Sequence, residues 1–205
     1  MGATFGMVFG MTQPLILVTG FGPFGEVVEN PSGLLAGALE SEPELLDGPI
    51  VVSRVLPVTF ADAPSTLHDF VSSNEARLPR ALLSMGVHPG RGFRLERLAR
   101  AHPSSKTTDT SGVVGSDENP TQIELIPREA SFDVQALLAD LAYEDARTSD
   151  DAGGYVCDWV YQHLLAHGKR LGIPALFLHV PSQGVTPLAQ QLPFVRKVVQ
   201  ALASL

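Results

Sequence analysis

Two short apolar runs near opposite ends of the chain constrain the fold more than any other feature. Residues 15–19 read LILVT and residues 175–181 read ALFLHVP, and neither run alternates with polar residues. A strand with one face in water alternates apolar and polar side chains, so these continuous runs indicate strands buried on both faces. Strands of this kind occur in α/β proteins, in which helices cover both faces of a sheet.

The segments between these runs alternate between strand-like and helix-like patterns. We expect further strands at 50–58, 80–85, 93–98 and 146–149. We expect helices from Pro31 with Asn30 as N-cap, over 61–73, after Ser131 as N-cap, from about 156, and from Pro193 to the end. This alternation predicts an α/β fold with a mostly parallel sheet covered on both faces.

Composition narrows the domain organisation and the possible partners. The chain has 205 residues, a net charge of −8 and one cysteine. The length suits one domain, which we place at 15–205, and we expect residues 1–14 to be an N-terminal extension without the features of a signal peptide. The acidic charge argues against nucleic acid and membrane as partners. A lone cysteine forms no internal disulfide, which favours a cytoplasmic location.

The hexapeptide GFGPFG, residues 20–25, matches the GxGxxG pattern of dinucleotide-binding proteins directly after a predicted strand. In those proteins the helix starts on the third glycine. Here a helix that started on the third glycine would soon reach Pro31, and the residue before a proline is disfavoured in the helical conformation. A dinucleotide-dependent oxidoreductase is therefore a minor alternative. The loop also presents Phe21 and Phe24, which are either core side chains or the walls of a ligand pocket.

Cys157 is the strongest candidate for a reactive group. It follows Gly153-Gly154 and lies where a helix is expected to begin, so the free N–H groups of the first turn would favour a thiolate. The alternative is a buried and inert cysteine. A cysteine nucleophile needs a histidine base and a group that orients the histidine, and His179 and Glu96 are candidates.

Two further histidines, His163 and His167, are four residues apart on the same predicted helix. Such spacing suits a metal site, but the segment HLLAH lacks the glutamate of the HExxH motif. We therefore expect both histidines on the helix surface and no metal.

Five sequence blocks, in order, resemble those of the pyroglutamyl peptidase I family, also called pyrrolidone carboxyl peptidases. They are TGFGPFG with Asn30-Pro31 behind it, RVLPV, PGR followed by LERLA, DAGGYVCD, and FLHVP. The similarity extends from Leu15 to Leu205. It implies a single α/β/α domain with a twisted mixed sheet, assembled into tetramers or dimers.

The resemblance also implies a function. Members of this family are cysteine peptidases that remove an N-terminal pyroglutamyl residue from peptides without metal or organic cofactor. The implied catalytic residues are Cys157 as nucleophile, His179 as base and Glu96 as the orienting carboxylate. The residues expected around the substrate are Phe21, Phe24, Asn30, Arg91, Tyr155 and Val156.

Two positions depart from the family pattern. Asp158 stands where many bacterial members carry an asparagine, and Val87 replaces a polar residue that some members use near the ring. A carboxylate next to the thiol would raise its pKa, so we expect Asp158 to point away from it. A catalytically inactive binding module with the same fold is the alternative function, although Glu96, Cys157 and His179 are all retained.

Overall fold

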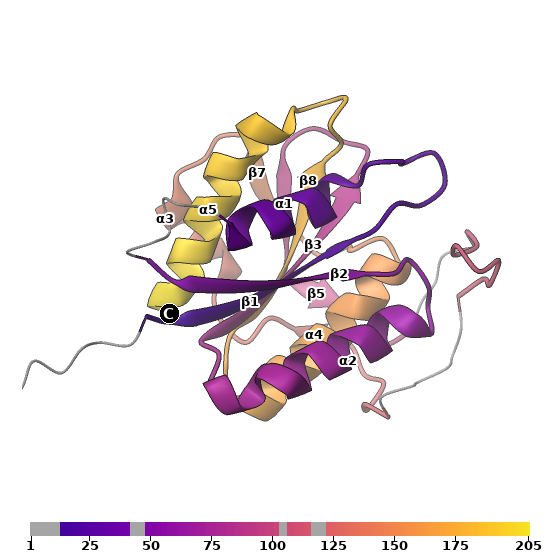
Figure 1. Ribbon diagram of the computed structural model, residues 1–205, viewed down its shortest axis with the longest axis horizontal. Helices are drawn as coiled ribbons and strands as arrows, with labels where there is room; N and C mark the ends of the chain where they lie inside the picture. The colour runs from indigo at the N-terminus through magenta and orange to yellow at the C-terminus, as the bar shows by residue number, and fades with distance from the viewer. Residues whose placement is uncertain (1–12, 42–47, 103–105, 116–121) are drawn as a thin grey trace, which may run out of the picture.

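The fold is given by a computed structural model that describes residues 13–41, 48–102, 106–115 and 122–205. A twisted sheet separates two layers of helices. Helices α1 (Pro31–Glu40), α3 (Val134–Leu141) and α5 (Leu188–Ser204) lie on one side, and α2 (Asp62–Asn74) and α4 (Val156–Leu171) lie on the other (Figure 1). The predicted three-layer α/β/α fold is confirmed.

The main sheet has six strands in the order β2-β1-β3-β8-β4-β7. All neighbours pair in parallel except β4 and β8, which are antiparallel. The strands are β1 (Leu15–Phe21), β2 (Ile50–Leu56), β3 (Ala81–His88), β4 (Phe93–Glu96), β7 (Ala146–Ser149) and β8 (Ala175–Pro181). The short strands β5 (Leu98–Ala99) and β6 (Arg128–Glu129) form a separate antiparallel pair, and a 3-10 turn spans Glu75–Arg77.

Each face of the sheet has its own apolar core. In β1, Ile16 and Val18 pack with α1 and α5, whereas Leu15 and Leu17 pack in the cluster that includes residues of α2 and α4. All seven residues of β1 are buried, as the continuous apolar run predicts. Burial on both faces explains why neither β1 nor β8 alternates in sequence.

The predicted start of α1 is confirmed, because Pro31 is its first residue and the Asn30 side chain accepts a hydrogen bond from the Ser32 N–H at 3.2 Å. The predicted cap of α3 is wrong. Asp133 caps this helix by accepting from the Ala136 N–H at 2.9 Å, since it lies at the correct offset and Ser131 precedes it by two residues.

The predicted start of α5 is also wrong. The helix begins at Leu188, and Pro193 lies inside it. Proline removes one backbone donor, but Pro193 is close to the helix start and exposed, so the helix passes through it.

Residues 1–12 of the expected N-terminal extension lie outside the described residues, as do residues 103–105 and 116–121 of the segment between β5 and β6. The described section 106–115 is held by Asp109, whose carboxylate accepts from the Phe60 N–H at 2.8 Å.

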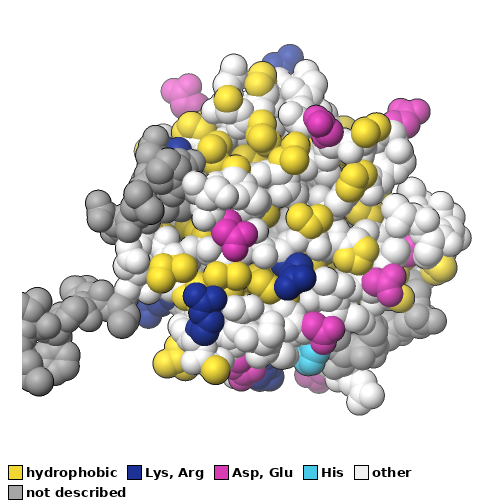
Figure 2. Space-filling view, in the orientation of Figure 1, with side chains coloured by type: hydrophobic (Ala, Val, Ile, Leu, Met, Phe, Trp, Pro, Cys, Tyr) yellow, Lys and Arg dark blue, Asp and Glu magenta, His cyan; other side chains and the backbone are white. Residues whose placement is uncertain are grey.

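Among the described residues, no helix is long and apolar enough to cross a membrane. On the face shown in Figure 2, Lys and Arg side chains stand apart from one another among acidic and apolar ones.

Candidate active site

Three neighbouring strands place one residue each in a row across the sheet. Gly86 of β3 is the register partner of His179 of β8, and Arg94 of β4 pairs with His179 from the other side. Residues paired across strands project to the same face, so all three lie on the face that α2 and α4 cover. Glu96, two residues after Arg94 on β4, shares this face.

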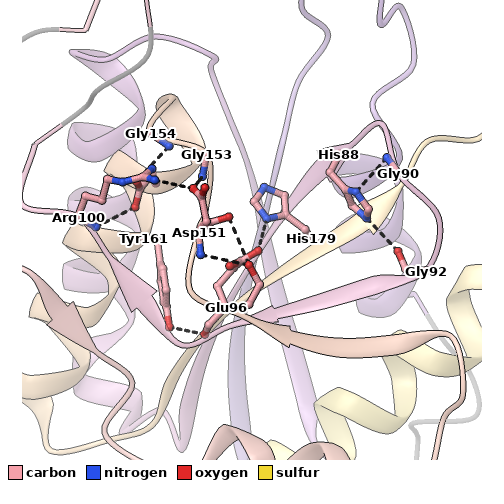
Figure 3. A network of polar contacts seen from close by, with 12 residues as sticks. His88, Gly90, Gly92, Glu96, Arg100, Asp151, Gly153, Gly154, Tyr161 and His179 are labelled. Atoms are coloured by element: carbon pink, nitrogen blue, oxygen red, sulfur yellow. Dashed lines mark hydrogen bonds and ion pairs between the residues drawn. The ribbon is translucent and has the colours of Figure 1, made fainter.

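Glu96 and His179 form a buried pair. The Glu96 Oε1 and the His179 Nδ1 are 2.8 Å apart, and the glutamate is fully buried (Figure 3). The Tyr161 hydroxyl donates to the Glu96 backbone carbonyl at 2.7 Å and so fixes this end of β4. The other carboxylate oxygen, Oε2, has no hydrogen-bond partner among the described residues. The imidazole is therefore the main partner of this carboxylate. With Nδ1–H donating to it, Nε2 is left as a proton acceptor.

Cys157 is the second residue of α4, as predicted. Gly153 and Gly154 have φ values of +92° and +65°, so the entry turn uses a conformation that favours glycine. The sulfur lies directly over β3, because a Cβ built on Gly86 would be only 2.8 Å from Sγ. The missing side chain at Gly86 makes room for the sulfur next to the strand that carries His179.

The thiol of Cys157 is protonated in the free protein. Burial raises its pKa to about 12, and the carboxylates of Asp158 and Glu96 act in the same direction, while its own backbone N–H opposes them. The prediction that the helix start favours a thiolate is therefore wrong for the free protein, because desolvation outweighs the N-terminal N–H groups. The base must remove the proton when the sulfur attacks.

Asp158 points away from the thiol, as expected. Its carboxylate accepts from the Arg100 backbone N–H at 3.0 Å, from the Arg100 guanidinium at 3.1 Å and from the Gly154 N–H at 3.1 Å. These contacts tie the first turn of α4 to the segment after β5 (Figure 3).

A cavity of about 310 Å³ opens in front of Cys157 and His179. Its lining is mainly apolar, and of the expected substrate contacts it includes Phe21, Phe24, Asn30 and Tyr155. The other lining residues are Val58, Val87, His88, Pro89, Arg94, Asp151, Ala152 and Gly153. Glu96 lies behind His179 and does not line it. Because the Asn30 side chain caps α1 and donates to the Gly22 carbonyl at 2.9 Å, it also holds the loop that carries Phe24.

Arg91 does not line this cavity. The His88 ring closes the turn after β3, with Nδ1 accepting from the Gly90 N–H at 3.0 Å and Nε2 donating to the Gly92 carbonyl at 2.9 Å (Figure 3). Gly92 has φ +69° and packs against the Asp145 carbonyl. This turn leaves Arg91 exposed over a separate hollow next to Asp145.

Val156 does not line the cavity either. It is fully buried in the core between α4 and the sheet. Its neighbours in sequence, Tyr155 and Cys157, are the residues of this turn that face the cavity, because successive residues at a helix start point in different directions.

His163 and His167 are buried, so the prediction that they lie on the helix surface is wrong. His167 lies between α4 and α2, where its ring centre is 5.3 Å from that of the exposed His68. The ring centre of His163 is 4.7 Å from that of Trp159 on the same helix. Burial lowers the pKa of His163 to about 3 and that of His167 to about 4. The described residues contain no group of three or more His, Cys, Asp or Glu that could hold a metal ion.

Sequence reasoning missed Gly86, Arg94 and Asp151. For Arg94 a signal was present, because residues two apart in a strand share a face and Glu96 was already a candidate. Gly86 gave no such signal, since only the packing of the helix on the sheet shows why the position must lack a side chain. Asp151 lies in the DAGG segment, where it accepts from the Gly153 N–H at 2.9 Å and pairs with Arg100 at 2.8 Å.

Comparisons with known proteins agree with one another. The family model for pyroglutamyl peptidase matches residues 15–192 of this chain. The pyrrolidone-carboxylate peptidase of Mycobacterium tuberculosis strain H37Rv is 30% identical over 174 residues, which cover 81% of this chain and 76% of the relative. That of Gloeobacter violaceus is 29% identical and covers 81% and 80%.

Solved structures show the same fold. The pyrrolidone carboxyl peptidase of Fervidobacterium islandicum AW-1 superposes with a TM-score of 0.82 at 25% identity, covering 94% of this chain and 99% of that one. The pyroglutamyl peptidase I of Bacillus amyloliquefaciens superposes with a TM-score of 0.82 at 21% identity, covering 94% and 98%.

Proposed function

This chain belongs to the pyroglutamyl peptidase family of cysteine peptidases, and we propose that it hydrolyses the bond after an N-terminal pyroglutamyl residue through Cys157, His179 and Glu96. The observation that carries the proposal is the 2.8 Å contact between Glu96 and His179 next to the cavity that also contains Cys157. A sulfur nucleophile, an imidazole and an orienting carboxylate are the groups that acyl transfer to cysteine requires.

The cavity suits a pyroglutamyl ring. This ring is a flat lactam with no ammonium group, so it needs an apolar slot with a few polar contacts and no acidic anchor. Phe21 and Phe24 offer the apolar walls. The hydrogen bonds of Asn30 to Ser32 and Gly22 are already made, so we propose that Asn30 mainly holds this loop in place. Backbone groups then bond the lactam amide.

The reaction proceeds in two steps. As the Cys157 sulfur attacks the scissile carbonyl, its proton passes to the His179 Nε2, and the Glu96 carboxylate stabilises the imidazolium. Backbone N–H groups at the start of α4 stabilise the oxyanion. His179 then gives its proton to the leaving amine, the C–N bond breaks and a thioester remains. Water attacks the thioester while His179 takes one proton from it and returns it to the sulfur, which releases pyroglutamate.

The alternatives are weaker. An inactive binding module would not need a buried carboxylate against His179, which costs desolvation energy. The dinucleotide alternative requires a helix that starts at Gly25, but α1 begins at Pro31.

We also propose that the enzyme is cytoplasmic and forms a homo-oligomer. Size-exclusion chromatography with light scattering would test the oligomeric state.

One assay tests the proposed activity. The wild type should release the fluorophore from a pyroglutamyl amide under reducing conditions, and it should not act on the matched alanyl amide. Since Cys157 is the only cysteine, iodoacetamide should abolish the activity, and Cys157→Ser should abolish it without changing the melting temperature. A silent wild type, or a fully active Cys157→Ser, would refute the proposal.

A further inference from the structure

We propose that Arg94 binds a carboxylate on the leaving peptide and so favours certain residues directly after the pyroglutamyl group. This inference rests on the proposed function and adds a specificity-determining residue to it. The carboxylate has two possible sources, the C-terminus of a pyroglutamyl dipeptide and the side chain of an Asp or Glu in the second position.

Arg94 lies where a leaving group must pass. It is the cross-strand partner of His179 and lines the same cavity. A Cβ built on Gly90 would be 3.1 Å from the Arg94 Nη2, so the guanidinium lies against the turn after β3. Because His179 protonates the departing amine, the leaving peptide lies on the His179 side, away from the ring slot at Phe21 and Phe24.

Arg94 forms no ion pair with another described residue. Its Nε is buried and has no hydrogen-bond partner within the part of the chain that the structure describes. Asp151 is the acidic residue in the cavity lining, and the hydrogen bond from the Gly153 N–H and the charge of Arg94 both help to lower the pKa of its carboxyl. The direct contacts of this carboxylate are with Arg100 and the Gly153 N–H. An arginine stays charged at all relevant pH values, so the cavity presents a cation that has no direct ion pair with another described residue.

A carboxylate is the ligand that best satisfies such a cation. A guanidinium binds it through charge-assisted and often bidentate hydrogen bonds, and a partly buried site strengthens them. His88 does not compete for the ligand as a second cation, because burial lowers its pKa to about 4. A leaving group with a carboxylate should therefore bind better than the same group with a neutral amide.

The test compares four peptides: pGlu-Ala, pGlu-Ala-amide, pGlu-Asp-amide and pGlu-Lys-amide. For the wild type we expect kcat/KM for a carboxylate substrate to exceed that for pGlu-Ala-amide by about tenfold, mostly through KM, and to fall with added salt. In Arg94→Gln this ratio should drop to about one, and Arg94→Lys should keep part of it. Both kcat/KM values in a ratio are measured on the same preparation of a variant. A misfolded fraction lowers both values equally and leaves the ratio unchanged.

Arg147→Gln is the matched control. Arg147 pairs with Arg94 in register on β7 and is exposed, and it lies outside the cavity, so its loss removes the same charge from the surface. The control should keep the wild-type ratio. A preference for pGlu-Ala alone identifies the C-terminus as the ligand, and a preference for pGlu-Asp-amide alone identifies the side chain. Equal rates for all four wild-type substrates, or an equal loss in Arg147→Gln, would overturn the proposal.

Binding to Cys157→Ser separates this inference from the proposed function. Calorimetry should show tighter binding of pGlu-Ala or pGlu-Asp-amide than of pGlu-Ala-amide, and the difference should vanish when Arg94→Gln is added. This result would support the role of Arg94 even if the wild type cleaved no peptide. Binding of none of these peptides, or equal binding of all, would count against it.

Discussion

Gly86→Ala is the change that most directly tests how the sulfur is positioned. The new Cβ would lie 2.8 Å from the Cys157 Sγ and 2.9 Å from the Phe177 Cζ, distances that side-chain carbons do not tolerate. Phe177 is fully buried and cannot yield, so the sulfur and the first turn of α4 must move.

The overlap at Gly86 determines how much stability and how much activity the substitution removes. Overpacking of this kind costs about 1–3 kcal/mol of folding free energy, which in a domain of this size lowers the melting temperature by roughly 2–12 °C. A displacement of the sulfur by about 1 Å from its place beside His179 should lower kcat by on the order of a hundredfold. KM should change much less, because the atoms nearest to the new methyl group belong to Cys157 and Phe177 and not to the ring slot at Phe21 and Phe24.

Thermal unfolding and steady-state hydrolysis of a pyroglutamyl amide measure the two effects. Gly37→Ala is the matched control, since a Cβ at that exposed position in α1 meets no described atom within 4 Å. It should leave activity unchanged and stabilise the helix by up to about 1 kcal/mol. If Gly86→Ala kept wild-type kcat and melting temperature, the placement of the sulfur over β3 would be wrong.

Three further predictions concern Glu96, Asp158 and the two buried histidines of α4. Glu96→Gln should lower kcat by about 10³- to 10⁴-fold while the protein stays folded by circular dichroism, because an amide does not stabilise the imidazolium; a loss below tenfold would contradict the triad. Asp158→Asn removes a carboxylate that raises the pKa of Cys157, so the pH profile of iodoacetamide alkylation should shift to lower pH, and a shift to higher pH would refute this. Burial lowers the pKa values of His163 and His167 to about 3 and about 4, from 6.5, so the unfolded chain takes up protons first as the pH falls. The free energy of unfolding measured in urea should therefore be highest above about pH 7 and decline between about pH 6.5 and 4. Each of the two histidines should contribute on the order of 1 kcal/mol of this decline per pH unit. The decline should be shallower in His167→Gln.

The sequence by itself determined the order and type of most elements. Continuous apolar runs identified β1 and β8, because strands buried on both faces need no polar side chains. Asn30-Pro31 and Gly153-Gly154 identified the starts of α1 and α4, because these residues act through local backbone geometry. The resemblance to a known family then pointed to Cys157, His179 and Glu96, which no local rule could have joined.

Only the tertiary structure decided which side chains share the cavity and what their protonation is. The antiparallel pairing of β4 with β8 sets Arg94 and Glu96 on the face of His179, whereas the turn after β3 leaves Arg91 outside. Burial likewise keeps the thiol of Cys157 protonated, although its place at a helix start suggested a thiolate. Register and desolvation depend on segments far apart in the chain, so a local reading of the sequence does not contain them.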